Sequence, residues 1–156
     1  MSEARLTVEL LEACAGAGER ERRAARVAAA IRRFGDYRWV GIYDVTADEI
    51  AVIGWDGPAP PAHPRFARSD GLCGAVAATG EAVIVGDVNA DPRYLTTHAT
   101  TRSEIVVPVS ARGRVVGLID VESEQADAFG EDDRQLLERC AAVIAPLWRA
   151  HDPGGR

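Results

Sequence analysis

Two pairs of β-rich segments, each joined by a short polar turn, constrain the fold of this chain most. Residues 37–45 (YRWVGIYDV) and 49–55 (EIAVIGW) are separated by the short stretch TAD, while residues 104–111 (EIVVPVSA) and 114–123 (RVVGLIDVES) meet at an Arg-Gly step. Runs rich in aromatic and β-branched residues that are joined in this way are typical of β-hairpins. The sequence therefore predicts an antiparallel sheet that contains two hairpins.

Helical segments precede and follow these strands. Residues 4–34 are mostly Ala, Leu, Glu and Arg, interrupted at CAGAGER, which predicts two helices or one kinked helix. A further helix is expected from about Asp132, with an apolar face that continues to Trp148. Between the hairpins, GLCGAVAATG predicts a short helical turn and AVIV a short strand. Helices at both ends of the chain and an antiparallel sheet between them indicate an α+β fold.

The length of 156 residues fits one domain, residues 1–156, with a single hydrophobic core. Within it we expect N-terminal helices over residues 1–35, a core over residues 37–148 and a disordered tail over residues 151–156. A long loop of about residues 86–103 is a candidate lid, because loops of this length in compact domains are often functional.

Composition and charge exclude several classes of partner. The net charge of −6 and the pI near 5.1 argue against a nucleic-acid surface. No apolar run reaches the ~18 residues that a membrane span needs, so no membrane contact is expected. The first residues, MSEARLTVEL, do not have the pattern of a signal peptide, and we therefore expect a cytoplasmic protein.

The three cysteines are not arranged as a disulfide framework or a zinc motif, because their number is odd and no CxxC pair occurs. Cys14 and Cys140 lie among apolar helical neighbours and are expected in the core. Cys73 is flanked by glycines at the start of a short helix, where amide dipoles can lower the pKa of a thiol. The alternative for Cys73 is a tight packing position.

Aromatic and acidic side chains share faces of the predicted strands. Trp39 and Tyr43 point to one side of their strand, and Asp120 and Glu122 to one side of theirs. Glu104 joins the two acids if the last two strands pair. The pattern has two interpretations, a pocket for a small cationic group or, favoured by the usual exposure of acids, the solvent face of an edge strand. A metal site is a weaker option because His63, His98 and His151 lack ligand spacing, and we expect none.

Four segments resemble GAF domains, and among them most closely the free methionine-(R)-sulfoxide reductases. These segments are RWVGIYDV, GLCGAVAATGEAVIVGDV, SEIVVPVSARGRVVGLIDVES and AFGEDDRQLLERCA, and the resemblance covers about residues 20–148. It implies a GAF fold, in which a six-stranded antiparallel sheet lies between helices and carries a closed pocket for a free amino acid. Stand-alone members of the family form dimers, so a homodimer is expected.

The resemblance also assigns roles to residues. Trp39 and Tyr43 would enclose the methyl-sulfoxide end of the ligand, and Glu104, Asp120 and Glu122 would bind its amino group. Family members commonly have Asp where Glu122 stands, a change that lengthens the side chain by one methylene.

The chain departs from the family at the expected nucleophile. The family's usual cysteine, seven positions before the Glu of SEIV, is Thr97 here, and a second family cysteine, ten positions before Cys73, is His63. A threonine hydroxyl cannot form a sulfenic acid, but Thr97 can hydrogen-bond a sulfoxide oxygen. Two hypotheses follow: a binding module that does not reduce its ligand, or a reductase that uses Cys73 with an external thiol such as thioredoxin. Neither requires a bound cofactor.

A third hypothesis is a GAF sensor for another ligand, such as a cyclic nucleotide. The acid-rich pocket argues against it, because buried carboxylates repel phosphate.

Overall fold

The computed structural model describes residues 1–149, so the tail expected to be disordered lies outside the described residues. The elements, in order, are α1 (Glu3–Ala15), α2 (Arg20–Gly35), β1 (Trp39–Val45), β2 (Glu49–Asp56), β3 (Arg65–Ala67), α3 (Gly71–Thr79), β4 (Val83–Val85), η1 (Val88–Ala90), β5 (Ser103–Ala111), β6 (Arg114–Ser123), α4 (Glu131–Ile144) and η2 (Ala145–Trp148). The strands form one antiparallel sheet in the order β3-β2-β1-β6-β5-β4. This arrangement confirms the predicted α+β fold.

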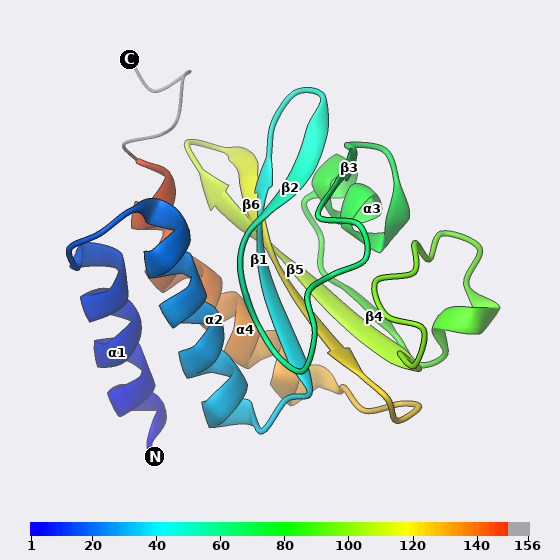
Figure 1. Ribbon diagram of the computed structural model, residues 1–156, viewed down its shortest axis with the longest axis horizontal. Coiled ribbons are helices and arrows are strands. Elements are labelled where there is room, and N and C mark those ends of the chain that lie inside the picture. The colour runs from blue at the N-terminus through cyan, green and yellow to red at the C-terminus, as the bar shows by residue number, and fades with distance from the viewer. Residues whose placement is uncertain (150–156) are drawn as a thin grey trace.

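The sheet lies between two layers of helices and loops (Figure 1), and a separate hydrophobic core lies on each of its faces. Helices α1, α2 and α4 cover one face, and the core there includes Cys14 and Cys140, as expected. Helix α3 and the loops around it cover the other face, where a smaller core contains Trp39, Tyr43 and Cys73. None of the helices within residues 1–149 is long and apolar enough to cross a membrane.

Both predicted hairpins are present. In the second, Arg112 and Gly113 have positive φ angles of 55° and 76°, as a two-residue turn between twisted strands requires. The predicted N-terminal helical region is two helices, with a break between Ala15 and Arg20. The residue patterns did not indicate β3, which has three residues and follows a proline-rich loop; only the resemblance implied a sixth strand.

A polar cluster fastens the helical layer to the sheet. The Arg20 side chain, which is 8% exposed, forms an ion pair with Asp44 on β1, and the Trp148 indole N–H donates to the other Asp44 oxygen at 2.7 Å. Trp148 lies against Gly117, where a Cβ atom would come within 2.1 Å of the indole ring. One carboxylate therefore holds α2 and η2 on the same face of the sheet.

We expect Asp44→Ala to lower the free energy of unfolding by about 2–3 kcal/mol, because it leaves the buried Arg20 charge and the indole N–H without an acceptor. Urea unfolding measures the loss. The matched control is Asp48→Ala in the exposed β1–β2 turn, which should change stability by less than about 0.5 kcal/mol. Equal effects of the two variants would contradict the structural role of Asp44.

Candidate functional site

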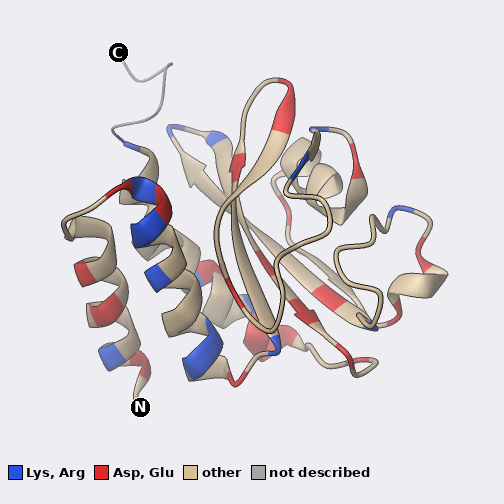
Figure 2. Cartoon of the chain, viewed as in Figure 1, with Lys and Arg blue, Asp and Glu red and all other residues tan. Residues whose placement is uncertain are grey.

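Three carboxylates meet near one end of the paired strands β5 and β6, on the face of the sheet covered by α3. Strand β6 lies between β1 and β5, so that Glu122 is directly opposite Trp39 on one side and Glu104 on the other. Asp120 is two residues before Glu122 and therefore on the same face. The red segments of β5 and β6 in Figure 2 mark this concentration of acids.

The favoured interpretation of Asp120 and Glu122, as the solvent face of an edge strand, is wrong. Strand β6 is paired on both sides, and each of the two residues is only 1% exposed. Glu104 is 3% exposed. The strand order is the reason, because it places β6 inside the sheet under α3 and the connecting loops.

Gly41 allows the aromatic side chains to close over the same region. It lies opposite Asp120, between Trp39 and Tyr43 on β1. A Cβ atom at Gly41 would come within 2.4 Å of the Trp39 ring and 2.9 Å of the Tyr43 ring. The missing side chain therefore lets both rings approach each other beside the Asp120 carboxyl group.

The acids lack the partners that buried carboxylates normally have. Glu104 Oε1, Asp120 Oδ1 and Glu122 Oε2 are buried without a hydrogen-bond partner. Burial raises the pKa of both Glu104 and Asp120 well above the usual range, and the charge of Glu122 adds to the shift. Such a cluster favours either protons or a positively charged ligand.

Cys73 lies beside the acids, in the first turn of α3. Its sulfur and one carboxylate oxygen from each of Glu104 and Asp120 all lie within 4.8 Å of one another. Burial raises the pKa of the Cys73 thiol well above its usual value, and the charges of Glu104 and Glu122 raise it further. This is opposite to the expected effect of the helix dipole, because desolvation and two nearby acids outweigh the amide dipoles.

A small cavity of about 10 Å³, the room of roughly one water molecule, lies beside these groups. Its lining comprises Tyr43, His63, Phe66, Gly71, Leu72, Cys73, Leu95, Thr97, Glu104 and Asp120. One cavity is therefore bordered by all three positions that hold cysteines in the family that the sequence resembles. These positions are His63, Cys73 and Thr97 in this chain. Trp39 and Glu122 are not among its lining residues.

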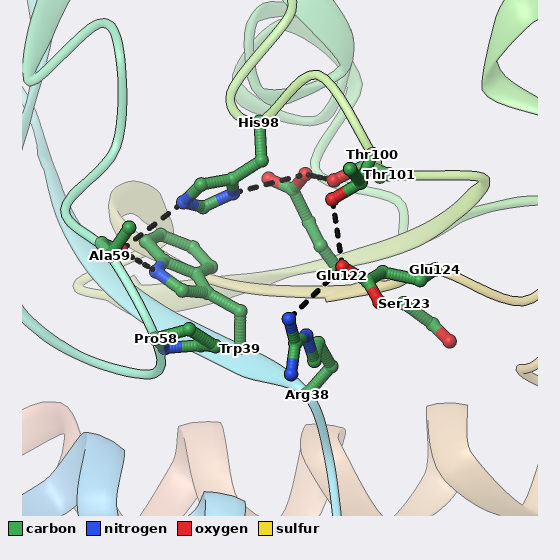
Figure 3. A pocket seen from close by; sticks show the side chains of 10 residues that line it. All are labelled: Arg38, Trp39, Pro58, Ala59, His98, Thr100, Thr101, Glu122, Ser123 and Glu124. Atoms are coloured by element: carbon green, nitrogen blue, oxygen red, sulfur yellow. Dashed lines mark hydrogen bonds and ion pairs between the residues drawn. The ribbon is translucent and has the colours of Figure 1, made fainter.

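Trp39 and Glu122 instead line a neighbouring pocket of about 100 Å³ (Figure 3). His98, which the sequence did not single out as a binding residue, lies between them. Its ring packs against Trp39 in an edge-to-face manner with centroids 5.0 Å apart, and its Nε2 contacts the Ala59 carbonyl oxygen at 3.2 Å. The Trp39 indole N–H donates to the same carbonyl at 2.9 Å. His98 thus joins two loops to the aromatic wall.

The long loop expected to act as a lid covers the strand ends and is tied to them. Thr101 donates a hydrogen bond from Oγ1 to Glu122 Oε1 at 2.8 Å, and Thr100 donates to Glu124 at 2.8 Å. The Ala62 amide donates to the Thr97 carbonyl at 3.0 Å, which joins this loop to the proline-rich loop. The two loops together form a wall of the site.

The contacts of His98 predict a pH-dependent contribution to stability. Its Nδ1 lies 3.9 Å from Glu122 Oε1, and the interaction with this carboxylate, followed by that with the Ala59 carbonyl, raises the His98 pKa against the opposing effect of burial. A raised folded-state pKa stabilises the fold below the unfolded pKa, and this stability is lost as pH rises through the folded pKa. The stability loss in His98→Gln should therefore be larger at about pH 5.5 than at about pH 8.5. Urea unfolding at both pH values measures it, and a loss that grows with pH would contradict the prediction.

Comparison of the sequence with known protein families identifies the family to which this fold belongs. A family model described as GAF domain matches residues 19–146. The chain belongs to the GAF domain family. The GAF domain-containing protein A of Dictyostelium discoideum is 31% identical over 121 residues, which are 77% of this chain and 75% of that protein. The predicted GAF fold is thereby confirmed.

Among the relatives of this GAF domain are free methionine-R-sulfoxide reductases, as the resemblance implied. The enzyme of Saccharomyces cerevisiae is 34% identical over 113 residues, which are 70% of this chain and 62% of the yeast protein. The X-ray structure of the enzyme from Neisseria meningitidis in complex with its substrate superimposes with a TM-score of 0.83 at 30% identity, covering 95% of this chain and 89% of that chain.

Proposed function

We propose that this GAF domain binds a free amino acid of the methionine or methionine sulfoxide type and does not reduce it. The observation that carries the proposal is the group of buried carboxylates with unpartnered oxygens next to an aromatic wall. An ammonium group supplies the positive charge and the N–H donors that Glu104, Asp120 and Glu122 lack. Trp39 and Tyr43 offer apolar contact to the methyl-sulfoxide end of the ligand.

The residues at the cavity favour binding over reduction. Sulfoxide reduction transfers the oxygen to a cysteine sulfur: the sulfoxide leaves as a thioether and the cysteine becomes a sulfenic acid. Thr97 cannot carry out this step, and its hydroxyl is instead proposed to donate a hydrogen bond to the ligand oxygen. Cys73 reacts poorly as a nucleophile because its raised pKa keeps it as a thiol.

The second candidate function is a one-cysteine reductase, favoured by the presence of Cys73 at the same cavity. Its sulfenic acid would condense with an external thiol, releasing water, and a second thiol would then release the protein as the free thiol together with a disulfide. Methionine production from L-methionine-(R)-sulfoxide with dithiothreitol measures this activity. The binding proposal predicts no production, whereas production that disappears in Cys73→Ser would establish the reductase.

Calorimetry with methionine, both of its sulfoxide epimers and cyclic nucleotides tests the binding proposal itself. We expect heat with at least one of the amino acids and none with the nucleotides. Heat with a cyclic nucleotide alone would identify a GAF sensor of another class and overturn the proposal.

We further propose that the domain works as a cytoplasmic homodimer, with α1 as the contact. This helix exposes Val8 and Leu11, which are 44% and 50% accessible on the isolated chain. Apolar side chains of this size on adjacent turns suit a contact between two copies. Light scattering that gives the mass of a single chain would contradict the dimer.

A further inference from the structure

Three potential metal-binding side chains from separate elements meet in the cavity. Cys73 comes from α3, Glu104 from β5 and Asp120 from β6, and one ligand atom from each lies within 4.8 Å of the others. We propose that these three residues bind a thiophilic divalent cation of the Zn²⁺ class in this GAF domain. The proposal shares residues with the amino-acid site but does not depend on amino-acid binding.

The spacing of the donor atoms suits a small tetrahedral ion. Zn²⁺ binds thiolate sulfur at about 2.3 Å and carboxylate oxygen at about 2.0–2.2 Å, so its ligands lie up to about 4 Å apart. The three atoms are already near this separation, and the strand pairing of β5 with β6 fixes the backbone of both carboxylates. Small side-chain rotations are sufficient to complete the geometry.

Buried oxygens without partners give an independent reason for a cation. Glu104 Oε1 and Asp120 Oδ1 have no hydrogen-bond partner, and both residues are more than nine-tenths buried. No arginine is among the described residues that line the cavity; His63 is the basic residue there. A bound cation would satisfy both oxygens and balance the charge of the neighbouring Glu122.

The donor set selects the kind of metal. A thiolate ligand favours Zn²⁺ and Co²⁺ over Mg²⁺ and Ca²⁺, which prefer an all-oxygen shell. Three protein ligands leave the fourth position of a tetrahedral ion open, and Thr97 and His63 line the same cavity as these three ligands. An ammonium group and the metal would compete for Glu104 and Asp120, so the ion would exclude the amino acid.

Titration of the reduced protein with Co²⁺ under anaerobic conditions tests this site, because cobalt bound to a thiolate has a near-ultraviolet charge-transfer band. We expect the band to reach its full intensity at one Co²⁺ per chain. Zn²⁺ should displace the cobalt and remove the band, whereas Mg²⁺ and Ca²⁺ should not. Absence of the band from the wild-type protein would overturn the proposal without the need for any variant.

Two kinds of variant locate the site. Cys73→Ser should abolish the band, whereas Cys140→Ser, the matched change at a buried cysteine on the opposite face of the sheet, should keep it. If Cys73→Ser does not fold, Glu104→Gln should weaken Co²⁺ binding at least about tenfold. A band that survives Cys73→Ser, or unchanged affinity in Glu104→Gln, would contradict the assignment.

Calorimetry of the metal-free protein with methionine and both of its sulfoxide epimers separates this proposal from the proposed function. Cobalt binding without amino-acid binding would leave the metal site standing and remove the proposed function. Amino-acid binding without the cobalt band would support the proposed function and remove the metal site.

Discussion

Asp120→Asn is expected to weaken binding of the free amino acid by about 100-fold and, at the same time, to stabilise the protein by about 1 kcal/mol at pH 7. Binding falls because the variant replaces an acceptor of the ligand's ammonium group with a neutral amide. Stability rises because Asp120 must either be buried as a charge or take up a proton at pH 7, whereas asparagine is neutral without proton uptake and its N–H₂ group can donate to the neighbouring Glu104.

The direction of the stability effect follows from the pKa of Asp120. Burial, followed by the charges of Glu104 and Glu122, raises the pKa of Asp120 well above the usual range of an aspartate. A carboxyl group with a raised folded-state pKa loses stability as pH rises from its unfolded pKa through its folded pKa, so Asp120 costs more stability at pH 7 than at about pH 4. The gain in Asp120→Asn should therefore shrink as the pH is lowered toward about 4.

Urea unfolding and calorimetry on the same preparations test both parts of this prediction. Asp48→Asn provides the same chemical change in an exposed turn, and it should alter stability by less than about 0.5 kcal/mol and leave binding unchanged. If Asp120→Asn kept the affinity of the wild-type protein, the carboxylates would not be the ammonium site.

Thr97→Cys should convert the binding protein into a reductase, with thiol-dependent turnover of L-methionine-(R)-sulfoxide at least about 100-fold above the wild-type rate. Thr97 lines the cavity that Glu104 and Asp120 also border, so a sulfur at this position would face the bound ligand. The new thiol would take the sulfoxide oxygen, become a sulfenic acid and be returned to the thiol by two equivalents of dithiothreitol thiol, with release of water.

Thr97→Ser is the matched control, because it keeps a hydroxyl and adds no redox chemistry; it should show no turnover. Chromatographic measurement of methionine quantifies both variants. An inactive Thr97→Cys that still binds the amino acid would show that position 97 is not where the sulfoxide lies.

The main elements of the fold could be predicted because their signals are local. Alternation and short polar turns identify β1, β2, β5 and β6, and the pairing of β5 with β6 brought Glu104 next to Glu122 as expected. Strand β3 could not be found in the same way, since it is three residues long and pairs with Glu49–Ala51 after a proline-rich loop. This segment is a strand because it pairs with the otherwise open edge of β2.

The environment of the site was less accessible to sequence reasoning. Patterning could not reveal that Asp120 and Glu122 are buried, because that depends on the position of β6 within the sheet. The role of His98 was missed because its contacts, Trp39 and Ala59, lie far away in the sequence. For Cys73 the helix start was correctly located, but burial beside acids, not the helix dipole, determines its pKa.

The most direct test of the central claim compares L-methionine-(R)-sulfoxide with its analogue that lacks only the α-amino group, by calorimetry on the wild-type protein. Recognition of an ammonium group by Glu104, Asp120 and Glu122 predicts binding of the amino acid and at least about 100-fold weaker binding of the analogue. Equal affinity for both compounds, or no heat with either, would contradict an amino-acid pocket built on these carboxylates.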